Sequence, residues 1–173
     1  TGEFQYGGGA TIDIVESRNG QPHVQKRTII NPGTLTSAGT IAGNNMFFLR
    51  SVFDAIGGFR HDMGASSGRS FIGPEDWEMT TRCSLAGMKG ILIPDAIVIH
   101  DHMREHGSET YAKTQVDYHL AAGAFYASMI ARGITPIWQF WGAQFPKTPD
   151  GKFHRGHLQY LHNEFQGAAD YVK

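Results

Sequence analysis

A glycine–proline corner that carries two adjacent acids is the feature that most restricts how this chain folds. Residues 73–76 read Gly-Pro-Glu-Asp. Proline suits the first turn of a helix because its missing N–H is not needed there, and carboxylates in that turn complement the helix dipole. The pattern predicts a helix over 74–86 that ends at Gly87. Glu75 and Asp76 then lie at the start of a helix, where they either cap the helix or act on a ligand.

Two short apolar segments follow this helix and end in histidines. Residues 90–93 and 96–100 predict strands, with Pro94-Asp95 between them. Alternate residues of a strand share one face, so His100 and His102 can both reach one metal ion. The alternative is that these histidines are structural. The order of an acidic pair followed by a histidine predicts that they converge on one cleft, as in an enzyme.

The rest of the chain predicts a mixed α/β architecture. Asn19-Gly20 is a typical hairpin turn between two β-branched stretches. Helical spacing of apolar residues recurs twice in the second half of the chain. In the last helix we expect Leu158, Leu161, Phe165 and Ala168 to face inward. The expected elements are strands at 10–15, 23–30 and 46–49, and helices at 51–56, 108–132 and 156–172.

Length and charge limit the classes of protein that need to be considered. The 173 residues predict a single domain: a hairpin and loop at 1–43, a core at 44–106 and a helical tail at 107–173. A net charge of −1 argues against nucleic acid as a partner. No apolar run reaches the roughly 20 residues of a membrane span, and no signal peptide is evident. With one cysteine, Cys83, the chain is expected to be cytoplasmic.

Three ordered motifs resemble the family 2 glycosyltransferases. Residues 44–59 resemble the family's N-x-x-F-R-x-x-F-x-x-I-G-G-F segment, and residues 73–87 resemble its G-G-E-D-x-D-L-x-x-R-x-x-x-x-G segment. Residues 94–100 are similar to the P-D-A-x-V-x-H strand that closes the site. The motifs fall within residues 44–104, and their order and spacing agree with the family.

The resemblance implies a GT-A fold, a mixed sheet with flanking helices, and transfer of a sugar from a nucleotide-diphosphate sugar to an acceptor hydroxyl. Asp76 matches the general base of inverting members, and Glu75 matches its partner. His100 matches a ligand of Mn²⁺ or Mg²⁺, with His102 as a weaker second ligand. The acceptor is expected to be a glycan or a lipid-linked sugar. Further contacts to substrate are expected from Asn45, Arg50, Gly73, Trp77 and Arg104.

One departure from the family concerns the nucleotide-binding half. The family carries an Asp-x-Asp metal motif before this region, and no Asp-x-Asp occurs here. No strand–loop–helix alternation long enough to cradle a nucleotide is present either. We therefore expect a partial GT-A fold, the acceptor side of a catalytic domain whose N-terminal half is missing. The isolated chain is then expected to be inactive.

Three other hypotheses remain open from the sequence. The aromatic residues Trp138, Phe140, Trp141 and Phe145 either belong to the core or form a non-catalytic carbohydrate-binding or assembly module. A metal-dependent hydrolase built on His100, His102 and Asp76 is a weaker hypothesis, because no recognised hydrolase spacing is present. The aromatic segment 134–146 is also consistent with peripheral contact with a membrane, although it lacks a basic face.

Overall fold

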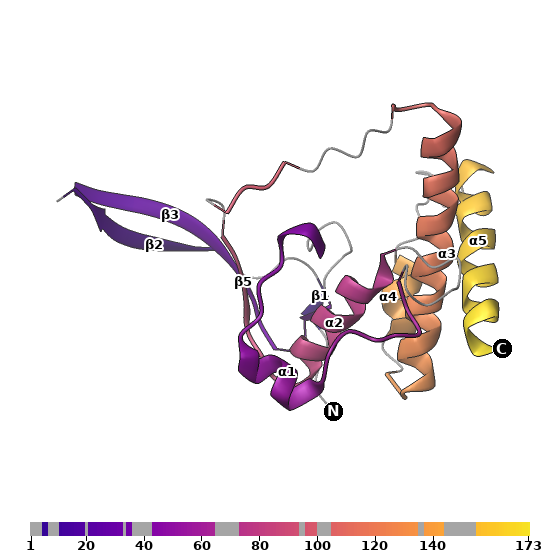
Figure 1. Cartoon of the computed structure of the whole chain (residues 1–173), viewed down its shortest axis with the longest axis horizontal. Coiled ribbons are helices and arrows are strands. Elements are labelled where there is room, and N and C mark those ends of the chain that lie inside the picture. The colour runs from indigo at the N-terminus through magenta and orange to yellow at the C-terminus, as the bar shows by residue number, and fades with distance from the viewer. Residues whose placement is uncertain are drawn as a thin grey trace. The chain divides into compact units, whose positions relative to one another are not determined.

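The computed structural model describes the chain in segments that fall into two compact units. One unit comprises Thr1–Gly58 and Met79–His100, and the other comprises Phe59–Glu78 and Asp101–Lys173. The described residues are 5–6, 11–19, 21–32, 34–35, 43–64, 73–93, 96–99, 105–134, 137–143 and 155–173. The structure is mixed α/β (Figure 1). Whether the whole chain is one domain, as its length predicts, stays a prediction.

The first unit is built around an antiparallel sheet. Strands β2 (Thr11–Arg18) and β3 (Gln21–Ile30) form the predicted hairpin. Asn19 in its turn has φ 52°, a left-handed conformation that asparagine tolerates better than most residues. Strand β5 (Gly90–Leu92) pairs antiparallel with the far end of β3, so the strand order is β2-β3-β5 (Figure 1). In a separate pairing, β1 (Gln5–Tyr6) lies parallel to β4 (Thr34–Leu35).

A short helix and part of a longer one belong to the same unit. The turn η2 (Gly43–Asn45) is followed by α1 (Arg50–Ile56). Helix α2 (Pro74–Leu85) contributes the residues from Met79 onward. The guanidinium of Arg82 donates hydrogen bonds to the carbonyls of Ile56 and Gly58, each over 2.7 Å. These bonds satisfy carbonyls at the end of α1, which would otherwise lack partners within their own helix.

Two predicted strands do not form. Residues 46–49 and 96–99 have no ladder partner, although their sequences are apolar and β-branched or aromatic. In place of a strand pair, Nδ2 of Asn45 donates to the carbonyl of Ala96 over 2.6 Å. Phe47, Leu49, Ile97 and Ile99 are exposed. Strand propensity therefore did not decide these segments, because pairing depends on a neighbour that is distant in sequence.

The second unit is helical. It contains α3 (Glu109–Ala131), α4 (Ile137–Ala143) and α5 (Arg155–Val172) together with the first residues of α2. The hydroxyl oxygen of Ser108 caps α3 by accepting from the Tyr111 N–H over 3.2 Å. Helices α3 and α5 lie side by side and run in the same direction (Figure 1). The helices predicted from periodicity are thus confirmed to within a residue or two.

Two glycines let α3 and α5 approach closely. A Cβ on Gly123 would overlap the carbonyl oxygen of Glu164, and a Cβ on Gly167 would overlap the carbonyl oxygen of Leu120. Neither position has room for any side chain, so the two backbones meet directly there. Small residues at such a crossing replace side-chain packing with contact between backbones.

The core of this unit is built from aromatic and aliphatic side chains. Its fully buried side chains include Phe125 and Met129 of α3 and Ile137 of α4. The prediction that Leu158 and Phe165 face inward is wrong, because each is about half exposed. The buried face of α5 instead carries Asn163, Glu164 and Gly167. In the described part of the chain, no helix combines the length and the apolar character needed to cross a membrane.

Candidate active site

The acidic corner at the start of α2 is built as the sequence predicts. Gly73 precedes the helix with φ 85°, a conformation that side chains with a Cβ rarely adopt. Pro74 is the first helical residue and is buried. Glu75 and Asp76 occupy the first turn and are partly buried. The corner therefore holds two carboxylates against the body of the second unit and does not leave them in a mobile surface turn.

The carboxylate of Glu75 is packed against backbone. A Cβ built on Gly64 would lie 2.5 Å from Oε2 of Glu75 and 2.6 Å from its Cδ, so the carboxylate rests directly on the Gly64 backbone and would have to move if that residue carried a side chain. Oε2 is shielded from solvent and has no hydrogen-bond partner within the part of the chain that the structure describes. A buried carboxylate oxygen without a partner is costly.

Asp76 is oriented by the backbone of its own helix. The N–H of Trp77 donates to Oδ1 of Asp76 over 2.6 Å. This bond to a carboxylate, in the first turn where backbone N–H groups lack helical partners, is favourable. The carboxylates of Asp76 and Glu75 thus sit next to each other along the chain but make different contacts.

Trp77 lies behind these acids in the core. Its indole stacks on Phe125, with ring centroids 4.0 Å apart and planes at 13°. It also meets the ring of Tyr126 edge-on at 5.4 Å. Trp77 is therefore a packing residue that fixes the position of the corner. Its predicted contact with substrate stays a prediction.

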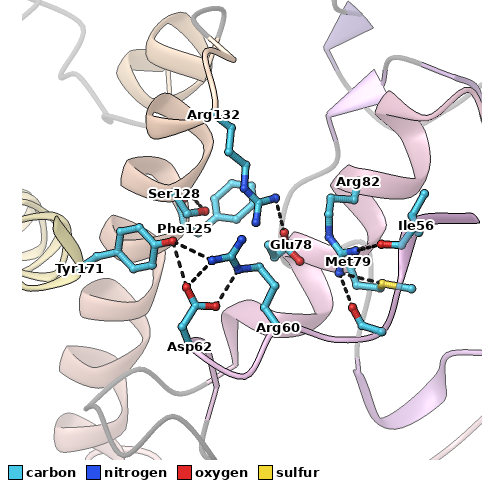
Figure 2. Close-up of polar contacts among 11 residues, drawn as sticks. Ile56, Arg60, Asp62, Glu78, Met79, Arg82, Phe125, Ser128, Arg132 and Tyr171 are labelled. Carbon is cyan, nitrogen blue, oxygen red and sulfur yellow. Dashed lines mark hydrogen bonds and ion pairs between the residues drawn. The ribbon is translucent and has the colours of Figure 1, made fainter. Parts of the chain in front are cut away.

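A cluster of polar and charged side chains fixes the segment just before Gly64. Arg60 pairs with Asp62 through both Nε and Nη2. The hydroxyl of Tyr171, near the end of α5, donates to Oδ2 of Asp62 over 3.1 Å (Figure 2). These contacts tie residues 60–62 to the C-terminal helix, and so hold the backbone on which Glu75 rests.

The electrostatics of this cluster follow from its hydrogen bonds and burial. The hydrogen bond from Arg60 is the main reason that the pKa of the Asp62 carboxyl lies below its ordinary value of 3.8. The bond to Asp62 likewise raises the pKa of Arg60, which stays charged. Burial raises the pKa of the Tyr171 phenol above its ordinary value of 10.0. All three groups therefore keep their usual neutral-pH protonation states in the folded protein.

A buried ion pair lies beside this cluster. The carboxylate of Glu78 is completely buried, and its Oε1 accepts from Nη1 of Arg132 over 2.7 Å (Figure 2). Glu78 lies in α2, and Arg132 is the residue that caps the C-terminal end of α3. The pair offsets the desolvation of Glu78 and joins the two helices.

The other predicted site residues are distributed between the described and undescribed parts of the chain. Asn45 is bonded to Ala96, as given above, and Arg50 forms an exposed pair with Asp54 at 3.5 Å. Both belong to the first unit. Arg104, His100 and His102 lie outside the described residues. So do Phe145 and the side chain of Phe140. The expected convergence of Asp76 and His100 therefore stays a prediction.

The described residues do not by themselves form a metal site. Among the described residues, no three side chains of His, Cys, Asp or Glu gather closely enough to hold an ion. The predicted ligands His100 and His102 are not among those residues. The expectation of a Mn²⁺ or Mg²⁺ site stays a prediction.

One polar cluster was not predicted from the sequence. The buried carboxylate of Glu164 accepts from Nε1 of Trp141 over 2.6 Å and lies 2.9 Å from Nδ1 of His119. His119 and Glu164 are 45 residues apart on α3 and α5. Each is a plain polar residue within a helical pattern, so only the packing of the two helices reveals the pair.

Comparison of the chain with known proteins found no relative. No protein-family model, curated protein or solved structure matches the chain.

Proposed function

We propose that this chain is the acceptor-side part of a family 2-like glycosyltransferase of the GT-A fold. In this proposal the enzyme transfers a sugar from a nucleotide-diphosphate sugar to a hydroxyl of a glycan or lipid-linked acceptor. One observation supports it most. The predicted acidic pair occupies the first turn of α2, and Oε2 of Glu75 is buried there without a hydrogen-bond partner in the described structure.

The proposed chemistry assigns the proton transfer to Asp76. A hydroxyl is a poor nucleophile until a carboxylate takes its proton, and a base held in place contributes typically 10²–10⁴-fold to the rate. The acceptor oxygen attacks the anomeric carbon, its proton passes to Asp76, and the bond to the nucleoside diphosphate breaks. A single displacement of this kind inverts the anomeric configuration.

Glu75 has a different proposed role. Its carboxylate would accept a hydrogen bond from a second hydroxyl of the acceptor sugar. That bond would position the acceptor beside Asp76. The packing against Gly64 keeps the carboxylate in place, so little reorganisation is needed when the acceptor binds.

Donor binding is assigned elsewhere in the proposal. The sequence contains no Asp-x-Asp, so the nucleotide-binding half is taken to come from outside these 173 residues. His100, with His102 as the weaker ligand, would hold Mn²⁺ or Mg²⁺. When bound, such an ion offsets negative charge on a leaving diphosphate. Asn45, Arg50 and Arg104 remain proposed substrate contacts.

The test is kinetic and uses the complete enzyme with its donor-binding half. Asp76→Asn is expected to lower kcat by about 10²–10⁴-fold with a smaller change in KM, since it removes the base but keeps the shape. Glu75→Gln is expected to raise KM for the acceptor. The matched control is Glu109→Gln, an exposed acid in the first turn of α3 with no assigned role.

Two results would overturn the proposal. One is near wild-type kcat in Asp76→Asn at an unchanged melting temperature. The other is an equal loss of kcat in Glu109→Gln, which would mean that the assay responds to helix-capping charge and not to a catalytic base.

A further inference from the structure

The end of the C-terminal helix is tied to the turn that supports the acidic corner. The ring of Tyr171 packs against Ala121 and Ala124, two small buried residues of α3. Its hydroxyl donates to Oδ2 of Asp62 over 3.1 Å and accepts from Nη2 of Arg60 over 3.3 Å (Figure 2). All five residues belong to the second unit. A side chain of α5 that is fixed on α3 therefore holds a turn 109 positions earlier in the chain.

The contact with Tyr171 attaches this turn to the helices of the unit. Arg60 and Asp62 are two residues apart, so the ion pair between them shapes the turn but does not connect it to another element. The hydrogen bond from Tyr171 makes that connection. Met63, the next residue, is almost completely buried and gives the turn an apolar anchor. The turn is thus held both by a hydrogen bond and by a buried side chain.

Two residues beyond Asp62 the backbone of the turn meets Glu75. Gly64 has φ 77°, and a Cβ placed on it would lie 2.5 Å from Oε2 of Glu75. Oε2 is shielded from solvent, whereas the residue as a whole is only partly buried. Closely packed atoms transmit small displacements. A shift of the turn at Gly64 would therefore move the carboxylate that rests on it.

We propose that Tyr171 is a positioning residue for the acceptor: through Asp62 it fixes the turn at Gly64 and thereby holds the Glu75 carboxylate in place. Tyr171 does not touch the acceptor in this proposal. The part that concerns the acceptor rests on the proposed function, in which Glu75 binds a hydroxyl of the acceptor sugar. The coupling between Tyr171 and Glu75 is a property of the folded chain and needs no substrate.

The first experiment follows the intact chain by NMR without any substrate. Tyr171→Phe removes the hydroxyl and keeps the ring. We expect the carboxyl carbon signal of Glu75 to shift and the Gly64 amide to exchange with solvent about three- to tenfold faster, as for the loss of one hydrogen bond. The matched control is Tyr160→Phe, which removes a hydroxyl from the same helix at a ring that stacks on His119. It should change neither signal.

The second experiment measures the kinetics of the complete enzyme with its donor-binding half. Tyr171→Phe is expected to raise KM for the acceptor by about three- to tenfold, with little change in kcat or in melting temperature, since the lost bond positions Glu75 and not the base. Asp62→Ala removes the other end of the bond and should raise KM at least as much. In the double variant the two effects should not add, because the hydroxyl acts through Asp62.

Two results would overturn the coupling itself. One is that Tyr171→Phe leaves the Glu75 and Gly64 signals as they are in the wild type, which would mean that burial of Met63 alone fixes the turn. The other is additive effects in the double variant, which would mean that Tyr171 does not act through Asp62.

The role toward the acceptor has its own contrary outcomes. An unchanged KM in Tyr171→Phe, or the same rise in Tyr160→Phe, would contradict it. A joint fall in kcat and melting temperature would make Tyr171 merely structural. Failure of the proposed function is seen elsewhere, in the kcat of Asp76→Asn, and the NMR signals of the intact chain do not depend on it.

Discussion

The indole of Trp77 stacks on the ring of Phe125 with 4.0 Å between centroids and 13° between planes. Trp77 directly follows Asp76, and Phe125 lies in the C-terminal half of α3 in the same unit. Packing this close, over two buried side chains, joins the catalytic candidates to the least exposed part of the helical core. The stability of the unit and the position of its acidic corner therefore depend on the same contact.

Replacing Trp77 with alanine tests this dependence. Truncation of a buried tryptophan removes its stacking and leaves a cavity, so we expect a loss of about 3–5 kcal/mol in the free energy of unfolding. Trp77→Phe should lose clearly less because a ring remains to stack on Phe125. Denaturant unfolding measures both. An equal loss in the two variants would contradict a stacking role.

The crossing of α3 and α5 is expected to tolerate no side chain. In Gly123→Ala the new methyl group would overlap the Glu164 carbonyl, and we expect destabilisation of about 3 kcal/mol or more because backbone must move. The control is Gly142→Ala in α4, where a Cβ meets nothing within 4 Å. That change should stabilise the helix by about 0.5–1 kcal/mol. Thermal unfolding compares the two, and a neutral Gly123→Ala would disprove the close approach.

The buried pair of Glu78 and Arg132 makes an asymmetric prediction. Arg132→Met removes the ion-pair partner of Oε1 in the completely buried Glu78 carboxylate. We expect this to lower the free energy of unfolding by about 3–5 kcal/mol. The double variant Glu78→Gln with Arg132→Met should recover part of that loss, because the buried negative charge that lost this partner is then gone. A double-mutant cycle by chemical denaturation gives the coupling. Additive effects would show that the two side chains do not interact.

Acid sensitivity should be carried partly by Asp62. The pKa of Asp62 in the folded state lies below 3.8, mainly because of the hydrogen bond from Arg60. Between that lower value and the ordinary value of 3.8, the folded protein therefore binds fewer protons than the unfolded chain. The stability from Asp62 is therefore present above its ordinary pKa and is lost as the pH falls through the lower folded value. Asp62→Asn should unfold with a shallower dependence on pH between about pH 5 and pH 2. Identical slopes for variant and wild type would contradict this assignment.

Glu75 is expected to show opposite effects on stability and activity. Its buried oxygen Oε2 lacks a partner in the described structure, so replacing the carboxylate by a neutral amide lowers the desolvation cost of that position. Loss of a favourable charge at the helix start offsets about 0.3–1 kcal/mol of that gain. Glu75→Gln should therefore melt at the same temperature as wild type or higher, while acceptor binding weakens. A clear drop in melting temperature would assign Glu75 a structural role.

Much of the local structure could be predicted because its causes are local. Within a helix, Pro74 is tolerated only in the first turn. Glycines follow the ends of α2 and α3 at Gly87 and Gly133. Asn19 suits the left-handed turn of the hairpin. Helical periodicity identified α3 and α5 for the same reason, since a helix closes its hydrogen bonds within its own segment. The acidic corner belongs to this class of features.

The errors concern features that depend on distant neighbours. Residues 46–49 and 96–99 look like strands, but a strand exists only when another segment pairs with it. Phe165 follows the helical period of buried residues, yet it is half exposed, because α3 packs closely against another face of α5 at Gly123 and Gly167. That face of α5 also carries Glu164, which lies 2.9 Å from Nδ1 of His119.

From its amino acids alone, then, this chain determines where helices α1, α2, α3 and α5 begin and end and where two carboxylates stand at a helix start. Short-range sterics and hydrogen bonds within a few residues suffice for that. Tertiary structure alone decided that Glu75 rests on Gly64, that Glu78 meets Arg132 and that Glu164 orients His119. Those meetings depend on packing and desolvation between segments far apart in sequence, which no local pattern encodes.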